Sequence, residues 1–235
     1  MAKVLLLWLE GPMQAWSTSS ALYRRPTEMF PTKSALWGML FNALGWYGKQ
    51  KKALAKVQHL PVRILGFQAP EQPVLRDYQT IGNGWDESDP WQNMMIPKRE
   101  DGKKCVGGGS KIVVKEYLCD ARFAAFVSVP NDWEDALRSA LANPAGSLYL
   151  GKKACLPSCP VFTGIYDSQT EAEAGLAAFL RERFETDEPV KPVFSVEEAD
   201  KYDPDGISIM DNPMAFGGVT ECGLRYVVVR QEQYP

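Results

Sequence analysis

The order of apolar segments along the chain restricts the fold more than any other feature of the sequence. An apolar run from Lys3 to Leu9 predicts a buried strand, and apolar residues recur at helical spacing from Pro31 to Gly45. Thr32 is suited to begin this helix as its N-cap, and Gly45 is suited to end it. A second strand is expected from Val62 to Gln68.

The same order of elements occurs a second time further along the chain. A strand is expected over Glu116–Val129, a helix opens at Asp132 and ends before Asn143, and a strand follows over Val161–Tyr166. Strand, helix, strand, then strand, helix, strand is the order of the ferredoxin-like fold, which the RNA-recognition motif shares. In that fold two helices cover one face of an antiparallel sheet. We therefore predict an α+β protein built on a ferredoxin-like domain over residues 1–166.

A long insertion interrupts this domain and an acidic tail follows it. The insertion, residues 69–115, is rich in glycine and proline, and a segment of this length without regular structure is usually functional or disordered. The tail, residues 167–235, contains an acidic helix expected over Glu171–Arg183 and a final strand over Leu224–Arg230. We predict that the insertion projects as a thumb and that the tail forms a small C-terminal subdomain.

Charge is distributed unevenly between the two ends of the chain. Residues 1–153 contain 20 Lys and Arg against 14 Asp and Glu, a net charge of +6, whereas residues 154–235 contain 6 against 15, a net charge of −9. A basic N-terminal part suits an anionic partner, and an acidic remainder suits a different one. An ordinary variation in charge between solvated faces is the alternative interpretation.

The chain has the composition of a globular protein that stays in the cytoplasm. No apolar run approaches the roughly 20 residues that a membrane span needs. The first residues lack a small-residue cleavage site, so we expect a buried strand there and not a signal peptide. The five cysteines are an odd number, which indicates reduced thiols in the absence of a secretion signal.

Motifs that would support catalysis are incomplete. His59 is the single histidine, and one histidine at a strand edge is more often structural than catalytic. Cys155 and Cys159 have no second Cys or His pair with which to hold zinc. Gly146–Lys153 imitates a phosphate loop, but Lys153 replaces the magnesium-binding Ser or Thr, and prolines follow where a helix should begin. We expect no catalytic residues, no cofactor and no bound metal.

Cationic, aromatic and amide side chains lie close together at several places in the basic part. This mixture suits single-stranded RNA, because Arg and Lys bind phosphates, rings stack on bases and amides hydrogen-bond base edges. The candidate RNA-binding residues are Gln14, Trp16, Arg24, Arg25, Lys33, Ser34, Arg76, Tyr78, Lys111, Lys115, Lys152 and Lys153. A place in the core is an equal possibility for Trp16, and a solvated charged turn is an equal possibility for Lys152 and Lys153.

Five segments between residues 11 and 153 carry a resemblance to a known family. They are Gly11–Trp16, Arg25–Thr27 with Phe30–Ser34, Leu75–Thr80, Glu116–Asp120 and Tyr149–Lys153. In this order they resemble the CasD family, the CRISPR-associated RAMP proteins of the fifth Cas family in type I-E systems. The acidic tail resembles that family only loosely.

The resemblance implies a non-catalytic subunit of the Cascade surveillance complex. In that family a ferredoxin-like domain holds the 5′ handle of the CRISPR RNA, a thumb packs against the neighbouring backbone subunit, and the body meets the large PAM-reading subunit. Residues 69–115 would correspond to the thumb, and Arg24–Ser34 with Lys152 and Lys153 would lie where the handle is held. Target DNA would be met only through the complex, and no membrane would be involved.

Two other functions stay open on the sequence. A related branch in type I-C systems is a metal-independent endoribonuclease that cuts precursor RNA with a tyrosine, a lysine and a histidine. Here no histidine follows Lys111 or Lys115, which argues against cleavage. The other alternative is a scaffold protein whose basic patch binds an acidic face of another protein.

Overall fold

The computed structural model describes most of the chain. The described residues are 2–18, 23–67, 74–81, 88, 90, 100–103, 111–217 and 220–231. Trp85 and Trp91, two aromatic residues of the insertion at residues 69–115, lie outside the described residues.

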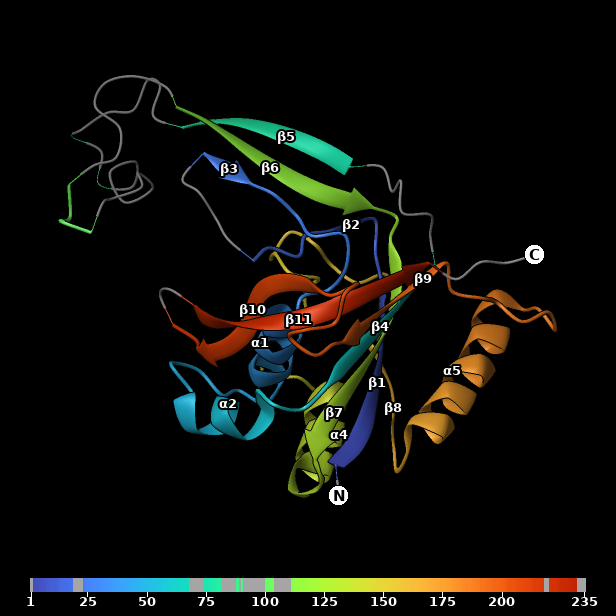
Figure 1. Cartoon of the computed structure of the whole chain (residues 1–235). Coiled ribbons are helices and arrows are strands. Elements are labelled where there is room, and N and C mark those ends of the chain that lie inside the picture. Colours follow the sequence, from blue (N-terminus) through green and yellow to red (C-terminus); the bar gives the residue numbers. More distant parts are fainter. Residues whose placement is uncertain are drawn as a thin grey trace.

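Within the described residues, seven antiparallel strands form the main sheet, in the order β10-β11-β9-β4-β7-β1-β8 (Figure 1). The strands are β1 (Ala2–Glu10), β4 (Val62–Gly66), β7 (Arg122–Pro130), β8 (Phe162–Tyr166), β9 (Phe194–Glu198), β10 (Ile207–Ala215) and β11 (Glu221–Gln231). The predicted strands at Lys3–Leu9, Val62–Gln68 and Val161–Tyr166 are confirmed as β1, β4 and β8. The protein is therefore a mixed α+β structure with antiparallel sheets.

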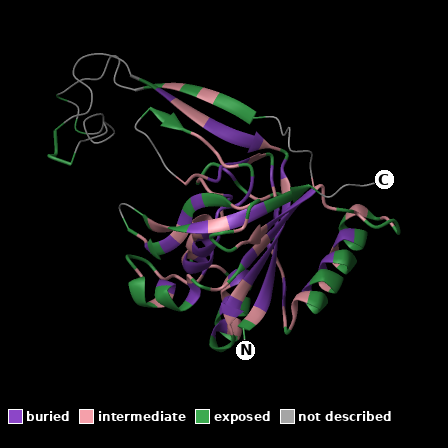
Figure 2. Cartoon of the chain, viewed as in Figure 1, coloured by how far each residue is buried: buried purple, intermediate pink, exposed green. Residues whose placement is uncertain are grey.

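Helices cover both faces of the main sheet (Figure 1). The helices are α1 (Lys33–Ala43), α2 (Lys51–Val57), the 3-10 turn η1 (Asn131–Trp133), α4 (Glu134–Ala142) and α5 (Gln169–Phe184). Leu5, Leu7 and Leu9 of β1 pack in the core with α1, α2 and α4, whereas Leu6 and Trp8 pack in a second core with α5. The run at the N-terminus is continuously apolar because successive side chains of a strand enter opposite faces. Figure 2 shows the resulting buried strands at the centre of the molecule.

A smaller sheet stands beside the main one (Figure 1). It contains β2 (Met13–Gln14), β3 (Arg24–Arg25), β5 (Val74–Ile81) and β6 (Lys111–Cys119), with β6 paired to each of the others. The single strand predicted over Glu116–Val129 is wrong, because the chain bends at Asp120, where φ is +52°, and passes from β6 into β7 of the main sheet. Asp is one of the few residues that adopts this left-handed conformation readily.

The insertion forms β-strands near its two ends, next to the body of the protein. Sequence reasoning expected no regular structure in residues 69–115, but β5 and the first part of β6 form an antiparallel hairpin from Val74 to Leu118. Between these strands only residues 88, 90 and 100–103 are described. The projecting thumb stays a prediction.

The strands after residue 166 belong to the main sheet. The predicted acidic helix is confirmed as α5, and the predicted final strand as β11. Sequence reasoning missed β9 and β10, and β9 pairs with β4 through Val196 and Ile64. Phe194 and Val227 also lie in the core that α1 and β1 form. The division at residues 166 and 167 into two domains stays a prediction, but the two parts share one sheet and one core.

The start of α1 is capped from the far end of the chain. Thr32 occupies the expected N-cap position, but its side chain makes no capping hydrogen bond. Instead the backbone N–H of Lys33 donates to Oδ2 of Asp211 in β10 at 2.8 Å. Gly45, with φ at +70°, follows the helix as predicted. A carboxylate at this end is favourable because the first N–H groups of a helix lack partners within it.

None of the helices in the described part of the chain is long and apolar enough to span a membrane.

Candidate nucleic-acid interface

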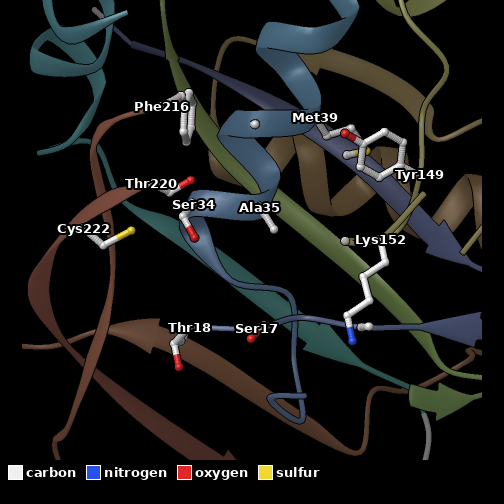
Figure 3. Close-up of a pocket in the computed structure, with 13 residues that line it drawn as sticks. Ser17, Thr18, Ser34, Ala35, Met39, Tyr149, Lys152, Phe216, Thr220 and Cys222 are labelled. Carbon is white, nitrogen blue, oxygen red and sulfur yellow. The ribbon is translucent and has the colours of Figure 1, made fainter. Parts of the chain in front are cut away.

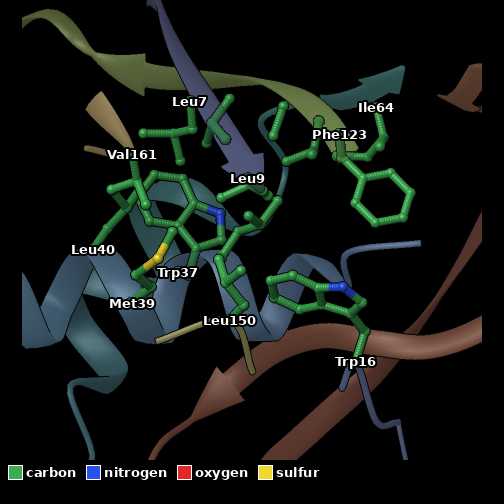
Figure 4. Close-up of a cluster of buried hydrophobic side chains, with 14 of the residues drawn as sticks. Leu7, Leu9, Trp16, Trp37, Met39, Leu40, Ile64, Phe123, Leu150 and Val161 are labelled. Atoms are coloured by element: carbon green, nitrogen blue, oxygen red, sulfur yellow. The ribbon is translucent and has the colours of Figure 1, made fainter. Parts of the chain in front are cut away.

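Gln14 and Trp16 are buried, and their contacts are structural. The Gln14 amide donates to the carbonyl oxygens of Leu9 and Ala121, at 3.2 and 2.6 Å, and accepts a hydrogen bond from Nε1 of Trp16 at 3.1 Å. Trp16 lies in the core beside Leu150, as Figure 4 shows. Their prediction as RNA contacts is therefore corrected, because neither side chain reaches solvent and every polar atom just named is already paired.

Lys33 is also buried, and its side chain is part of a network of ion pairs. Its Nζ lies 3.1 Å from Oε1 of Glu198 and donates to the Gln58 carbonyl oxygen at 3.0 Å. Arg225 reaches the same Glu198 oxygen at 3.3 Å and donates to Oδ2 of the fully buried Asp211 at 2.8 Å. Burial lowers the pKa of Lys33, although Glu198 opposes the shift. The side chain of Lys33 joins distant strands, and it is removed from the candidate RNA contacts.

The remaining candidates of the small sheet divide between its two faces. Residues paired in register point to the same side of a sheet, and successive residues point to opposite sides. Arg24 pairs with Val114, and Arg76 pairs with Glu116, so both arginines share one face. Arg25 pairs with Lys115, which places these two on the other face together with Tyr117. Sequence reasoning did not predict which of these residues share a face.

The face with Arg24 and Arg76 is exposed and partly neutralised. Both guanidinium groups approach Oε1 of the buried Glu116, at 3.3 and 3.4 Å. Tyr78, which pairs with Val114, also lies on this face and is 66% exposed. The arginines remain solvent-exposed, so this face offers cations beside an aromatic ring.

On the other face, Lys152 meets Tyr117. Its Nζ lies 4.8 Å from the centre of the Tyr117 ring, a distance suited to a cation–π contact. Lys152 Nζ is buried and has no hydrogen-bond partner among the described residues. A buried ammonium group without an acceptor is unfavourable, because desolvation is not offset.

Two further cations and two groups of opposite effect lie near Lys152. Burial lowers the pKa of Lys152, and the positive charges of Lys115 and Arg25 lower it further, whereas Cys155 and Glu116 raise it. We name Arg25, Lys115 and Lys152 the cationic cluster. An anion placed among these side chains would supply the missing acceptor and the missing negative charge.

The turn that carries Lys152 is fixed by backbone contacts. Ala15 N–H donates to the Leu150 carbonyl oxygen at 3.1 Å, and Leu150 N–H donates to the Cys155 carbonyl oxygen at 2.7 Å. Gly151 has a φ of +87°, and a Cβ there would lie 1.8 Å from the Ala15 carbonyl oxygen, so only glycine fits. Lys153 is exposed. The chain runs from this turn into β8, so the helix of a phosphate loop does not follow it.

A cavity of about 280 Å³ lies beside Lys152 (Figure 3). Ser34, another candidate from the sequence, lines it together with Ala35, Gly38 and Met39 of α1. Its other lining residues are Ala15, Ser17, Thr18, Tyr149, Gly151, Lys152, Phe216, Thr220 and Cys222. Sequence reasoning missed the cavity because its walls come from four separate parts of the chain.

Lys111, His59 and a possible metal site were also considered from the sequence. Lys111 lies in β6, but the position of its side chain is not described. His59 is exposed in the turn after α2. Among the described residues no group of three or more His, Cys, Asp or Glu is placed to hold a metal ion.

Comparison with known proteins places the chain in a family. A family model described as CRISPR-associated protein (Cas_Cas5) matches residues 4–228. The CRISPR system Cascade subunit CasD of Escherichia coli (strain K12) is 32% identical over 174 residues, which cover 70% of this chain and 71% of that protein. The chain belongs to the Cas5 family of CRISPR-associated proteins.

Solved structures show the same fold. A chain of a CRISPR RNA-guided surveillance complex superposes with a TM-score of 0.70 at 23% identity, covering 97% of this chain and 89% of that one. A structure described as a crystal structure of a Cas protein gives a TM-score of 0.61 at 22% identity, covering 97% and 93%. The fold that these structures share with the chain therefore extends over nearly its whole length, including the strands after residue 166 that sequence resemblance matched only loosely.

Proposed function

We propose that this Cas5-family chain is a non-catalytic subunit of a CRISPR Cascade surveillance complex and holds the 5′ handle of the CRISPR RNA in antiviral defence. The observation that carries the proposal is the cationic cluster, three basic side chains gathered on one face of the small sheet. Lys152 has no acceptor among the described residues, and Arg25 is exposed. Phosphodiester groups are the anions that such a cluster on an open sheet would bind. The relative from Escherichia coli is itself a Cascade subunit.

The body of the protein supports the same proposal. We infer that β1, α1, β4, β7, α4 and β8 form a ferredoxin-like unit, because the four strands are ordered β4-β7-β1-β8 and are antiparallel throughout. Several RNA-binding modules use this arrangement. The hairpin of β5 and β6 would be the base of a thumb, residues 69–115, that contacts the neighbouring backbone subunit.

The remaining partners follow from membership of such a complex. The large PAM-reading subunit would contact the body, and target DNA would be met only through the assembled complex. Residues 1–166 would carry the cationic cluster, and residues 167–235 would support it through the shared core. The protein would act in the cytoplasm, where CRISPR RNA is made.

Removal of two charges from the cationic cluster tests RNA binding. Arg25→Gln with Lys115→Gln should weaken binding of CRISPR repeat RNA by the full-length chain, measured by filter binding. Lys52→Gln with Lys56→Gln removes the same charge from the exposed surface of α2 and should leave binding nearly unchanged. Equal affinities for both double variants would refute the proposed interface and favour a protein-binding scaffold.

A cleavage assay tests the absence of catalysis. The purified chain should leave CRISPR precursor RNA intact, both with magnesium and with EDTA. Site-specific products that disappear on His59→Ala would instead show an endoribonuclease.

A further inference from the structure

The cavity beside Lys152 is unusual in having a glycine of a helix interior as part of its floor. Gly38 is the sixth residue of the eleven-residue α1 and lines the cavity. Glycine is the least favourable residue in a helix interior except for proline. A glycine in the interior of a helix is often explained by a neighbour that would clash with a side chain.

At Gly38 no such neighbour is found in the described structure. A Cβ built there meets only Cζ of Phe216, at an ordinary contact distance of 3.9 Å. Gly146 differs, because a Cβ there would lie 2.4 Å from the Asn42 side chain. Packing within the chain therefore explains Gly146 but leaves Gly38 unexplained. What a side chain at Gly38 would occupy is the cavity itself.

The walls of the cavity combine rings, hydroxyl groups and one cation. Figure 3 shows Tyr149 and Phe216 on opposite sides of α1, with Ser34 and Ala35 between them. Phe216 is held by an edge-on contact with Phe41 of α1, at 5.7 Å between ring centres. Lys152 lies at the side of the small sheet, where its amino group meets the ring of Tyr117 in β6, and it has no acceptor among the described residues.

The size and lining match one nucleotide. A volume of about 280 Å³ is near the lower end of small-molecule sites, roughly 300 Å³, which suits a ligand the size of one nucleotide. Apolar and aromatic walls suit a base that has left its stack, hydroxyl groups suit a ribose or base edge, and an ammonium group suits a phosphate.

We propose that this cavity receives a single unstacked nucleotide of the bound RNA, with its phosphate at the amino group of Lys152 and its base over Gly38. The inference rests on the proposed RNA-binding function. It also gives the acidic C-terminal part a role, because Phe216, Thr220 and Cys222, from β11 and the connection before it, form one wall of the nucleotide site.

The test scans RNA with a fluorescent base analogue. CRISPR repeat RNA from the same host is bound to the full-length chain with 2-aminopurine at each position in turn. One position should change its emission on binding. In Gly38→Leu, whose side chain would fill the floor of the cavity, that position should keep the emission of free RNA. Affinity should also fall by about ten-fold, which corresponds to roughly 1.4 kcal/mol.

Two control variants separate filling of the cavity from damage to the fold. Gly38→Ala adds one methyl group at contact distance from Phe216, so it should raise the melting temperature and weaken RNA binding less than leucine does. Ala55→Leu changes an exposed position of α2 and should affect neither measurement. If Gly38→Leu fails to fold, the graded effect of Gly38→Ala and the position-specific emission of the unaltered protein decide the question.

The outcomes distinguish the two proposals. Two results together would overturn the nucleotide site but leave the proposed function intact. Gly38→Leu would bind RNA with unchanged affinity, and no position of the RNA would change its emission on binding to the unaltered protein. No RNA binding by the unaltered protein, even at low salt, overturns both. Tight binding of adenosine monophosphate, with no effect of Gly38→Leu on RNA, would identify a site for free nucleotides and also overturn the inference.

Discussion

Lys33 and Lys152 are two lysines whose amino groups lie in the interior, and their surroundings are opposite. Lys33 faces Glu198 and the Gln58 carbonyl oxygen, within a network in which Arg225 and Asp211 balance the remaining charge. Lys152 faces the ring of Tyr117, lacks an acceptor among the described residues, and is flanked by further cations. The first arrangement is complete within the chain, whereas the second lacks an acceptor, which under the proposed function would be a phosphate of the RNA. Burial alone therefore does not distinguish a lysine with partners inside the chain from one without them.

The strongest test of the first arrangement is Asp211→Asn. Asp211 is fully buried, caps α1 through Lys33 N–H and pairs with Arg225, so loss of its charge leaves a buried guanidinium underpaired. We expect the free energy of unfolding to fall by about 3–5 kcal/mol, measured by urea denaturation. Asp205→Asn, at an exposed turn, is the matched control and should change it little. A loss below about 1 kcal/mol would show that the network is not structural.

Replacing each lysine by methionine should sharpen the contrast. Lys33→Met removes a charged hydrogen bond and leaves Glu198 with one cation fewer, so we expect a loss of about 1–3 kcal/mol in unfolding free energy. Lys152→Met removes an ammonium group that is desolvated without an acceptor, so the change should lie within about 0.5 kcal/mol or be stabilising. Similar losses in both variants would contradict the comparison.

RNA binding should give the reverse ranking of the same two variants. Lys152→Met should weaken RNA affinity and flatten the slope of log K against log salt concentration by about 0.7, because one phosphate contact is lost. Lys33→Met should keep both the slope and, in the folded protein, the affinity. An unchanged slope in Lys152→Met would mean that its amino group does not meet a phosphate.

The smallest expected effect is a dependence of RNA binding on pH. Burial lowers the pKa of Lys152 in the free protein, and a nearby phosphate would favour the protonated form and raise that pKa. Binding would therefore take up protons, and RNA affinity should fall as pH rises through the pKa of the free protein. Lys152→Arg should remove this decline, since guanidinium stays protonated. An identical decline in both proteins would assign the titration to another group.

Much of the architecture followed from local patterns. The continuous apolar run of β1, the helical spacing of α1 with Gly45 after it, and the acidic helix α5 each appear in a short window of sequence. The elements that were missed have no comparable pattern within a short stretch of sequence. β9 is only five residues long and follows a proline-containing link, and β10 contains Pro213 and alternates exposed with buried residues. The bend at Asp120 was missed because apolar residues continue on both sides of it.

The sequence by itself determined the class of the protein: an α+β chain with a basic N-terminal part, the motifs of the Cas5 family and a set of candidate cations. Which of those cations are available was decided only by the tertiary structure. Lys33 and Glu198 are 165 residues apart in the chain, and Arg25, Lys115 and Lys152 lie on three separate segments. The availability of a charged side chain depends on its burial and on the distance to its partners, and both arise from contacts between segments that no local pattern records.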